Sequence, residues 1–354
     1  MAVERVLGRR ELNRALLARQ LLLERSPESV PRAVEQLAGL QAQYTPSPYL
    51  SLWTRLAEFE RQSLTCALEC KEVVKALLMR GTLHIVTPRD FWAAATARRE
   101  LGGSPWPPSF EQRLPAHELA RIAGQILVEL RDEPRTFSEV GTLLAPHADG
   151  ELSTTFLWRR VQGQEHVVHV PPSGTWGYHK EGVYRAAGSV IPGEAPPAEE
   201  ALDHLVRRYL AAFGPAAKQD VAQWAGIPRL GPIAQSLARL GLPTFLDDRG
   251  RTLYDLPGAP LPDPDTPAPT RLVPRFDNLV LAHADRTRVL GDVPPSRIVT
   301  KNAIVHATIL LDGFVAGTWQ LVRGRVALEP FGRLGREARA ALADEAAKLE
   351  AFVA

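Results

Sequence analysis

The sequence predicts a mixed α+β fold, mainly α-helical, in which winged-helix units follow one another and a small β-rich unit closes the chain. Three observations predict it. Helical hydrophobic patterns alternate with short strand-like runs, and one order of helices and hairpin recurs along the chain. A segment with six prolines, residues 256–270, then separates the helical part from a β-rich end. We therefore expect blocks at residues 1–110, 111–190, 191–262 and 263–354.

The first block is the most divergent copy of the repeated unit. One helix carries an apolar stripe at helical spacing, formed by Leu12, Ala15, Leu16, Leu22 and Leu23. A second helix begins near Ser29 and Pro31, which are typical of a helix start. Residues 63–80 follow with a helical pattern, and residues 81–88 read as a short strand. Helices followed by a strand predict the outline of a winged helix.

The second and third blocks repeat this outline more clearly. In the second, helical patterns at 115–130, 135–144 and 153–164 precede strand-like runs at 166–170 and 174–180. In the third, helical patterns at 199–213, 216–227 and 229–242 precede a strand-like run at 244–256, whose "DDRG" marks a turn. A long helix, a short helix, a third helix and a hairpin are typical of a helix-turn-helix with a wing.

The C-terminal unit is predicted to be β-rich. Residues 276–285, 302–322 and 324–331 are rich in strand-forming side chains and are broken by Gly313, Gly317 and Gly324, as in hairpins. Residues 336–353 then show a helical pattern. We expect this helix to pack on the strands.

Composition excludes several classes of protein. The 354 residues are 45% hydrophobic and 23% charged, which is ordinary for a globular chain. No apolar run approaches the ~20 residues that cross a bilayer, and the first residues lack the apolar stretch of a signal peptide. We expect a soluble cytoplasmic protein with no membrane partner.

The net charge of +2 is too small to indicate a nucleic-acid partner. The distribution of charge along the chain is more informative. Two basic runs stand out: Arg5, Arg9, Arg10, Arg14, Arg19 and Arg25 near the start, and Arg271, Arg275, Arg286, Arg288, Arg297 and Lys301 near the end. Each run alone is interpreted as a solvated face.

The sequence shows no sign of a cofactor or a metal. Cys66 and Cys70 are four residues apart on a predicted helix, and no second cysteine pair exists to complete a zinc site, so we expect buried thiols. His166 and His169 lie three apart in a strand-like run and would point to opposite faces. A glycine-rich phosphate loop and a lysine placed for Schiff-base chemistry are also missing from the sequence.

The segment "GLQAQYTPSPYL", residues 39–50, carries two glutamines around one alanine. Gln41 and Gln43 would lie about 200° apart on a helix, but on the same side of an extended chain. Pro46 and Pro48 push the preceding residues toward extended geometry, so the pair falls at or just past a helix end. The amides therefore either cap the end of that helix or hold a ligand together.

The chain resembles the AlkZ-type DNA glycosylases, a family of bacterial enzymes built from tandem winged helices. The resemblance rests on "LQAQ" at 40–43, "LMRGTLHIV" at 78–86, "RFDNLVLAHADRTRVL" at 275–290, "LLDGFVAGTWQLV" at 310–322 and "VALEPF" at 326–331. It covers nearly the whole chain, although the middle third matches in its order of helices and strands more than in its residues. A second Gln-x-Gln, Gln162 to Gln164, lacks this neighbourhood and is given no role.

The resemblance implies an activity and a site. Family members remove bulky N7-alkylated guanines, leaving an abasic site, and unhook interstrand crosslinks. Their catalytic signature is Gln-x-Gln, with aspartate last in a sister branch, so the resemblance implies Gln41 and Gln43 as the catalytic residues. Because the motifs for cofactors, metals and Schiff-base chemistry are missing, we expect a cofactor-free, metal-free, monofunctional DNA glycosylase without lyase activity. The lack of heptads favours a monomer, which would act on double-stranded DNA in the bacterial cytoplasm and nucleoid. Antibiotic self-resistance is a family role that the sequence does not decide.

Two neutral amides can serve this chemistry for a physical reason. Alkylation at N7 makes the base cationic, so it departs neutral and needs no general acid, unlike most glycosidic leaving groups. A glutamine offers one acceptor and two donors, and a pair can orient a water. An amide cannot take the proton at neutral pH, so such a site works only on lesions already primed to leave.

Five residues are predicted DNA contacts. Arg159 and Arg160 follow Trp158 on the predicted third helix of the second block, and Lys180 lies in its hairpin. Arg286 and His283 lie in "LAHADR". Four of the five have an open alternative. Arg159 and Arg160 can lie over a core tryptophan, the hairpin with Lys180 can pack on its own block, and His283 can be a structural residue. We interpret Asp277 and Asn278 as turn formers.

Two other functions stay open from the sequence. A winged-helix transcription regulator would bind DNA without chemistry, but such proteins dimerise through a dedicated helix and the chain shows no heptads. A protein that sequesters a drug in its β-rich unit is the third possibility. Release of free base from alkylated DNA would distinguish the enzyme from both.

Overall fold

The structure is a computed structural model that describes residues 5–103, 113–149 and 151–354. Helices and three β-sheets mix throughout these residues, so the predicted α+β class is confirmed. The predicted boundary at residues 110 and 111 lies outside the described residues. No helix among the residues described is long and apolar enough to cross a membrane.

The N-terminal part supplies the strand that carries the first glutamine. Its elements are β1 (Val6–Leu7), α1 (Arg9–Arg19), α2 (Val30–Gln36), β2 (Leu40–Gln41), α3 (Pro46–Trp53), α4 (Arg61–Glu69), β3 (Val74–Leu77), η1 (Met79–Gly81), β4 (Leu83–Val86) and α5 (Pro88–Leu101). The helix predicted over 63–80 is wrong in its second half. Lys71 adopts a left-handed φ of 61°, and the β-branched Val73 and Val74 then enter a strand.

The middle part has its own apolar core, built around Leu119, Leu130 and Leu157. Its elements are α7 (Ala116–Asp132), β5 (Arg135–Thr136), α8 (Phe137–Leu144), η2 (Ala145–His147), α9 (Thr154–Gln164), β6 (Val167–His169), β7 (Val183–Ala186) and η3 (Ala187–Ser189). Strand β6 pairs with β3 through His169 and Lys75. The strands of the first two parts therefore form one six-stranded sheet, in the order β2-β4-β3-β6-β7-β5.

The third part packs against the large core of the N-terminal part, chiefly through contacts between α10 and α5. Its elements are α10 (Ala198–Phe213), α11 (Lys218–Ala225), α12 (Leu230–Leu240), β8 (Thr244–Asp247) and β9 (Thr252–Tyr254). The hairpin predicted at 244–256 is confirmed. Strand β1 adds to it in parallel, so the start of the chain belongs spatially to this third part.

The C-terminal part is a β unit with one packing helix, as predicted, but the β-rich stretch predicted at 276–285 is wrong because these residues contain no strand. Residues 256–270 contain no helix or strand. Then follow β10 (Arg271–Val273), η4 (Asn278–Val280), α13 (Thr287–Leu290), η5 (Pro295–Arg297), β11 (Ala307–Leu311), β12 (Phe314–Val322), β13 (Arg325–Pro330) and α14 (Arg336–Val353). Strands β10 to β13 form an antiparallel sheet, and α14 packs beside it.

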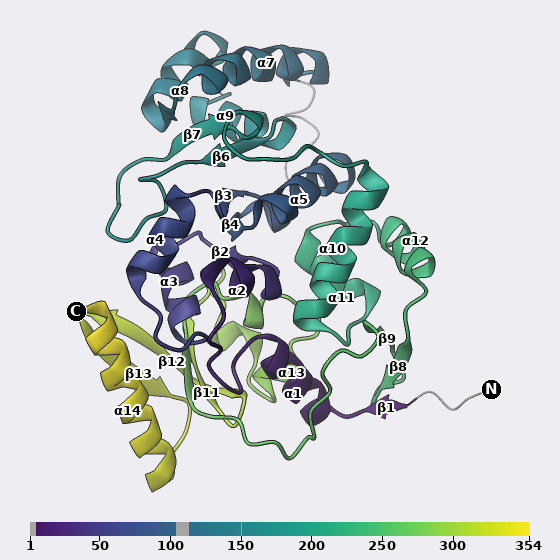
Figure 1. The fold of residues 1–354 in the computed structure, drawn as a ribbon, viewed down its shortest axis with the longest axis vertical. Coiled ribbons are helices and arrows are strands. Elements are labelled where there is room, and N and C mark those ends of the chain that lie inside the picture. Colours follow the sequence, from purple (N-terminus) through teal and green to yellow (C-terminus); the bar gives the residue numbers. More distant parts are fainter. Residues whose placement is uncertain (1–4, 104–112, 150) are drawn as a thin grey trace.

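The arrangement places β2 near the centre of the molecule. Figure 1 shows α7 to α9 at one end of the long axis and α14 with its sheet toward the other, with β2 between them. The predicted block boundaries at residues 190 and 262 are not tested by the structure and stay predictions.

Candidate functional site

The chain between α2 and α3 is forced out of helical geometry. Ala38 and Gly39 both have positive φ, 53° and 89°, directly before β2. A Cβ on Gly39 would lie 2.7 Å from a methyl of Val86, so no larger residue fits this approach of two backbones. The prediction that the glutamines lie just past a helix end is confirmed.

Gln41 is held by its carbonyl oxygen. It pairs with His84 across β2 and β4, and only 7% of the residue is exposed. Its Oε1 accepts a hydrogen bond from Nη2 of Arg80 at 2.9 Å. Its amide nitrogen donates to no residue in the described part of the chain. The carbonyl is therefore fixed and both N–H groups stay available.

Gln43 is also held by its side-chain carbonyl, in this case by β4. The residue is exposed, and its Oε1 accepts a hydrogen bond from the backbone N–H of Leu83 at 3.3 Å. Between the two glutamines, the backbone N–H of Ala42 donates to the carbonyl of Leu83 at 2.7 Å. Both carbonyls are thus anchored on β4 and the turn before it. No hydrogen bond joins the two amides within the described residues.

Arg80 connects Gln41 to two distant segments. Its φ of 56° is left-handed, which is unfavourable for a residue with a Cβ and marks a conformation imposed by its surroundings. Besides Gln41, it donates to the carbonyl of Trp224 at 2.9 Å and to Oδ1 of Asn278 at 2.8 Å. All three acceptors are neutral. Burial, and secondarily the charge of Arg286, lower the pKa of Arg80 to about 10.

His84 contributes a neutral imidazole beneath Gln41. Burial, helped by the nearby charge of Arg80, lowers its pKa to about 3. Its Nδ1 lies 3.0 Å from the carbonyl of Thr82 and therefore carries the proton. Its Nε2, 3.5 Å from Nη2 of Arg80, is then an acceptor. His84 is uncharged at neutral pH and too weak a base to activate water.

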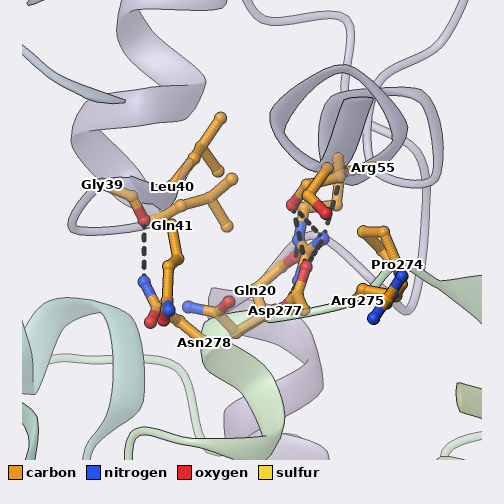
Figure 2. A pocket seen from close by; sticks show the side chains of 12 residues that line it. Gln20, Gly39, Leu40, Gln41, Arg55, Pro274, Arg275, Asp277 and Asn278 are labelled. Atoms are coloured by element: carbon orange, nitrogen blue, oxygen red, sulfur yellow. Dashed lines mark hydrogen bonds and ion pairs between the residues drawn. The ribbon is translucent and has the colours of Figure 1, made fainter. Parts of the chain in front are cut away.

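A small cavity separates Gln41 from the loop after β10. Its volume is about 10 Å³, close to the least that holds one water. Figure 2 shows Gln41 and Asn278 together on one side of it and the ion pair of Arg55 with Asp277 on another. The amide of Asn278 also donates to the carbonyl of Gly39 at 3.2 Å, which ties this loop to the start of β2.

Asp277 lies beside this cavity but has no free oxygen. Arg55 donates to both carboxylate oxygens, at 2.8 and 2.9 Å, and Ser51 Oγ and the backbone N–H of Leu279 complete the set, each at 2.9 Å. Asp277 is therefore a buried anchor that fixes the loop. It is not positioned as a base.

The structure leaves four of the predicted DNA contacts available. Arg159 and Lys180 are exposed, and Arg160 and Arg286 are partly exposed. None of the four side chains makes a hydrogen bond or ion pair to another described residue. Their contact with DNA stays a prediction.

His283 is placed differently from its predicted role. It is 1% exposed, its Nε2 lies 3.1 Å from the carbonyl of Phe213, and the rings of Tyr209 and Phe213 lie 6.1 Å away. Burial holds its pKa well below the ordinary value. The predicted DNA contact is contradicted by this burial, and the structural alternative describes His283.

The cysteine prediction is also wrong. Cys66 and Cys70 are both exposed, because they lie on the outer face of α4 while Leu64, Ala67 and Leu68 occupy its inner face. Among the described residues, no group of three or more His, Cys, Asp or Glu side chains is arranged to hold a metal ion.

Three residues beside Gln41 were not predicted from the sequence to lie there: Arg80, His84 and Asn278. The signal was present, because Arg80 and His84 lie in "LMRGTLHIV" and Asn278 lies in "RFDNLVL". What the sequence did not contain was the distance between these segments in space. Asn278 was interpreted as a turn former, yet its side chain bridges Arg80 and Gly39.

Comparison with known proteins gives one consistent family. Residues 34–352 match the sequence model of a family described as DNA glycosylase AlkZ-like. An "Interstrand DNA cross-link repair glycosylase" from Streptomyces sahachiroi is 25% identical over 360 residues, covering 89% of this chain and 88% of that protein. The solved structure of the Streptomyces sahachiroi DNA glycosylase AlkZ superposes with a TM-score of 0.83 at 22% identity, covering 98% of this chain and 97% of the other.

Proposed function

The chain belongs to the AlkZ-like DNA glycosylase family, and from that premise we propose that it hydrolyses the N-glycosidic bond of N7-alkylated guanine in double-stranded DNA, leaving an abasic site. The name of the Streptomyces sahachiroi relative refers to interstrand cross-link repair, and we extend the proposal to bulky adducts and crosslinks. Gln41 and Gln43 are the proposed catalytic residues. The proposed scaffold is a tandem array of winged helices acting as a monomer.

One observation supports this proposal: the carbonyl of Gln41 is anchored by Arg80 and that of Gln43 by Leu83, while their amide N–H groups have no partner among the described residues. Fixed carbonyls cannot rotate to exchange places with the nitrogens, so the donors have a defined direction. Such donors, with the remaining lone pairs of the carbonyls, can hold a water beside the sugar.

Among the described residues, those around Gln41 include no group placed to act as a general acid or base. His84 is neutral with a pKa of about 3, and both oxygens of Asp277 are occupied. A charged leaving base needs no proton, so a cationic 7-alkylguanine suits this site, whereas an unmodified base would require an acid. The chemistry available therefore selects for the lesion.

The register of the sheet supports a monofunctional enzyme. Gln41 lies opposite His84, while Lys75 lies opposite the next residue, Ile85. Directly opposed side chains share a face and successive ones alternate, so Lys75 points to the other face of the sheet. Its pKa, lowered to about 8 by burial, would suit an amine nucleophile, but its position separates it from the sugar. The abasic product should stay uncleaved until alkali is added.

The test is base release from a duplex carrying one 7-alkylguanine. We expect Gln41→Ala and Gln43→Ala each to lower the single-turnover excision rate by roughly 10²-fold, because each removes half of the water-orienting pair. Gln43→Asp should retain activity or exceed wild type, since an exposed carboxylate can stabilise the sugar cation. Unfolding curves should match wild type for all three.

The chain offers a matched control. Gln162 and Gln164 form a second Gln-x-Gln on α9, and Gln164→Ala should excise at the wild-type rate. Wild-type rates for both Gln41→Ala and Gln43→Ala would refute the assignment. A retarded DNA band without release of base from the wild-type protein would instead support a DNA-binding regulator.

A further inference from the structure

Arg275 is a cation at the edge of the glutamine cavity that has no counter-ion among the described residues. It follows β10 and lines the same cavity as Gln41, across from it in Figure 2. Its Nε is buried with no hydrogen-bond partner, and its guanidinium makes no ion pair in the described part of the chain. A buried donor left unpaired is unfavourable, and more so on a charged group.

Two aromatic rings fix the direction of this guanidinium. Its central carbon lies 5.4 Å from the ring of Tyr44 and 5.7 Å from that of Phe276. Tyr44 directly follows Gln43 and is 42% exposed. Phe276 has a left-handed φ of 60°, and the next residue, Asp277, is locked by Arg55. A side chain stacked in this way loses little further freedom on binding.

The charge of Arg275 conflicts with the proposed reaction unless an anion neutralises it. Excision develops positive charge on the sugar, and a free guanidinium close to Gln41 would destabilise that charge. Arg80 adds a second cation whose acceptors are all neutral. The DNA backbone carries the compensating charge, and planar guanidinium donors match phosphate oxygens.

We propose that Arg275, held by Tyr44 and Phe276, binds a DNA phosphate adjacent to the target nucleotide and so sets the position of the sugar against Gln41 and Gln43. This inference rests on the proposed function and deepens it by naming a positioning residue. Arg275 acts through the backbone of the substrate and does not touch the reacting atoms.

The experiment replaces individual phosphates by neutral methylphosphonates. Full-length protein is titrated with duplexes that carry a tetrahydrofuran abasic analogue and one methylphosphonate at each of the flanking positions in turn. With unmodified phosphates, Arg275→Gln should bind about tenfold more weakly than wild type, as for a charge-assisted hydrogen bond. With the methylphosphonate at one flanking position, wild type and variant should bind equally.

Arg297→Gln is the matched control, because Arg297 also lies over an aromatic ring, 4.1 Å from Phe331, but does not line the cavity. It should lose affinity by less than twofold, with no position-specific coupling. Arg275→Lys keeps the charge without the planar fork and should fall between wild type and Arg275→Gln. Thermal melting of each variant checks that it is folded.

Two results would overturn the inference. One is a loss of affinity in Arg275→Gln that is the same for every methylphosphonate position. The other, measured on wild-type protein alone, is binding that no flanking methylphosphonate weakens. Because the ligand carries no base, failure of excision does not affect this measurement, and the two proposals can fail separately.

Discussion

Two groups of arginines in this chain differ in their partners. On the first helix, Arg10 and Arg14 both pair with Asp312, and Arg19 pairs with Asp255 at 2.6 and 2.8 Å. Arg14 and Arg19 are almost completely buried. Arg5 and Arg9 are exposed and Arg10 is partly exposed, but the sequence interpretation of this run as a solvated face is wrong for Arg14 and Arg19. These arginines tie the start of the chain to segments more than two hundred residues away.

Near the glutamines, Arg55 pairs with Asp277, but three other arginines have no such partner among the described residues. Arg80 donates only to neutral acceptors, and Arg275 and Arg286 make no ion pair within the described residues. Burial lowers the pKa of Arg286 as well, and its charge lies close enough to lower that of Arg80. The one carboxylate of the Gln41 cavity, Asp277, is already paired with Arg55, so among the described residues Arg80, Arg275 and Arg286 have none.

The difference shows what a basic run can and cannot indicate. A run of arginines becomes structural when carboxylates from elsewhere in the fold meet it, and a ligand surface when they do not. Asp255 and Asp312 are remote in sequence, so local charge counting could not separate the two cases. Substitutions that remove one partner should therefore affect stability in the first group and excision in the second.

The largest effect is expected from breaking the buried pair at Arg19. Asp255→Ala leaves a fully buried guanidinium without its carboxylate, and the free energy of unfolding should fall by about 3–5 kcal/mol. Excision per folded molecule should stay at the wild-type rate. Urea unfolding followed by circular dichroism measures the first quantity, and single-turnover base release measures the second.

A double substitution controls for the unpaired charge. Arg19→Met combined with Asp255→Ala removes both partners and should recover much of the lost stability, because an apolar side chain can replace a buried pair. If Asp255→Ala unfolds at the wild-type urea concentration, the first-helix arginines are not structural and the comparison fails.

The second effect concerns Arg80. Arg80→Met removes the hydrogen bond that fixes the carbonyl of Gln41, so the amide can rotate. We expect the excision rate to fall by roughly 10²-fold, which is the effect of displacing a reacting group by about 1 Å. The free energy of unfolding should stay equal or rise, because the substitution removes a buried charge that has no carboxylate partner. The left-handed φ at position 80 is the same in both proteins and adds no difference. Base release and urea unfolding on the same preparation test both parts.

Arg14→Met is the counterpart from the first helix. It should lower stability and leave excision per folded molecule unchanged, since Arg14 contacts Asp312 and the backbone around it. If Arg80→Met lost stability and kept its excision rate, Arg80 would belong with the first-helix arginines.

Much of the fold followed from the sequence because its signals are local. The hairpin at 244–256, the proline-rich connection and the C-terminal helix each depend on turn residues or periodicity within a short window. Strand β3 pairs with β6 in the register of Lys75 and His169, which are far apart in the chain. No local pattern predicts such a contact, so the shared six-stranded sheet was not predicted.

The site was predicted only in part for the same reason. Gln41 and Gln43 could be proposed together because they share one short segment, to which the resemblance assigns a role that stays a prediction. Arg80 and Asn278 reach Gln41 from other segments through left-handed turns and loop anchors. His283 was misplaced because "LAHADR" does not reveal that the rings of Tyr209 and Phe213 enclose it.

The smallest effect is expected from pH, and it tests whether the site near Gln41 uses any ionising group. Between pH 5 and 9 the amides do not titrate, His84 with a pKa of about 3 stays neutral, and Arg80 with a pKa of about 10 stays charged. We expect the single-turnover rate, at saturating protein, to vary by less than about twofold over this range. A fall should begin only as pH approaches 10 and Arg80 loses its proton.

The acid limit of this profile is set by stability. The pKa values of His84 and of His166, about 3 and about 4, lie below the ordinary 6.5, so the unfolded chain binds more protons than the folded one between pH 6.5 and 3. The free energy of unfolding must therefore fall as pH drops through that window, so excision rates are compared above pH 5.

Two changes in the pH dependence of the excision rate can be distinguished. A change near pH 8 that disappears in Lys75→Met would come from Lys75. A change in the excision rate between pH 5 and 8 that persists in Lys75→Met would show that an ionising base takes part in the reaction. The amide mechanism would then have to be abandoned.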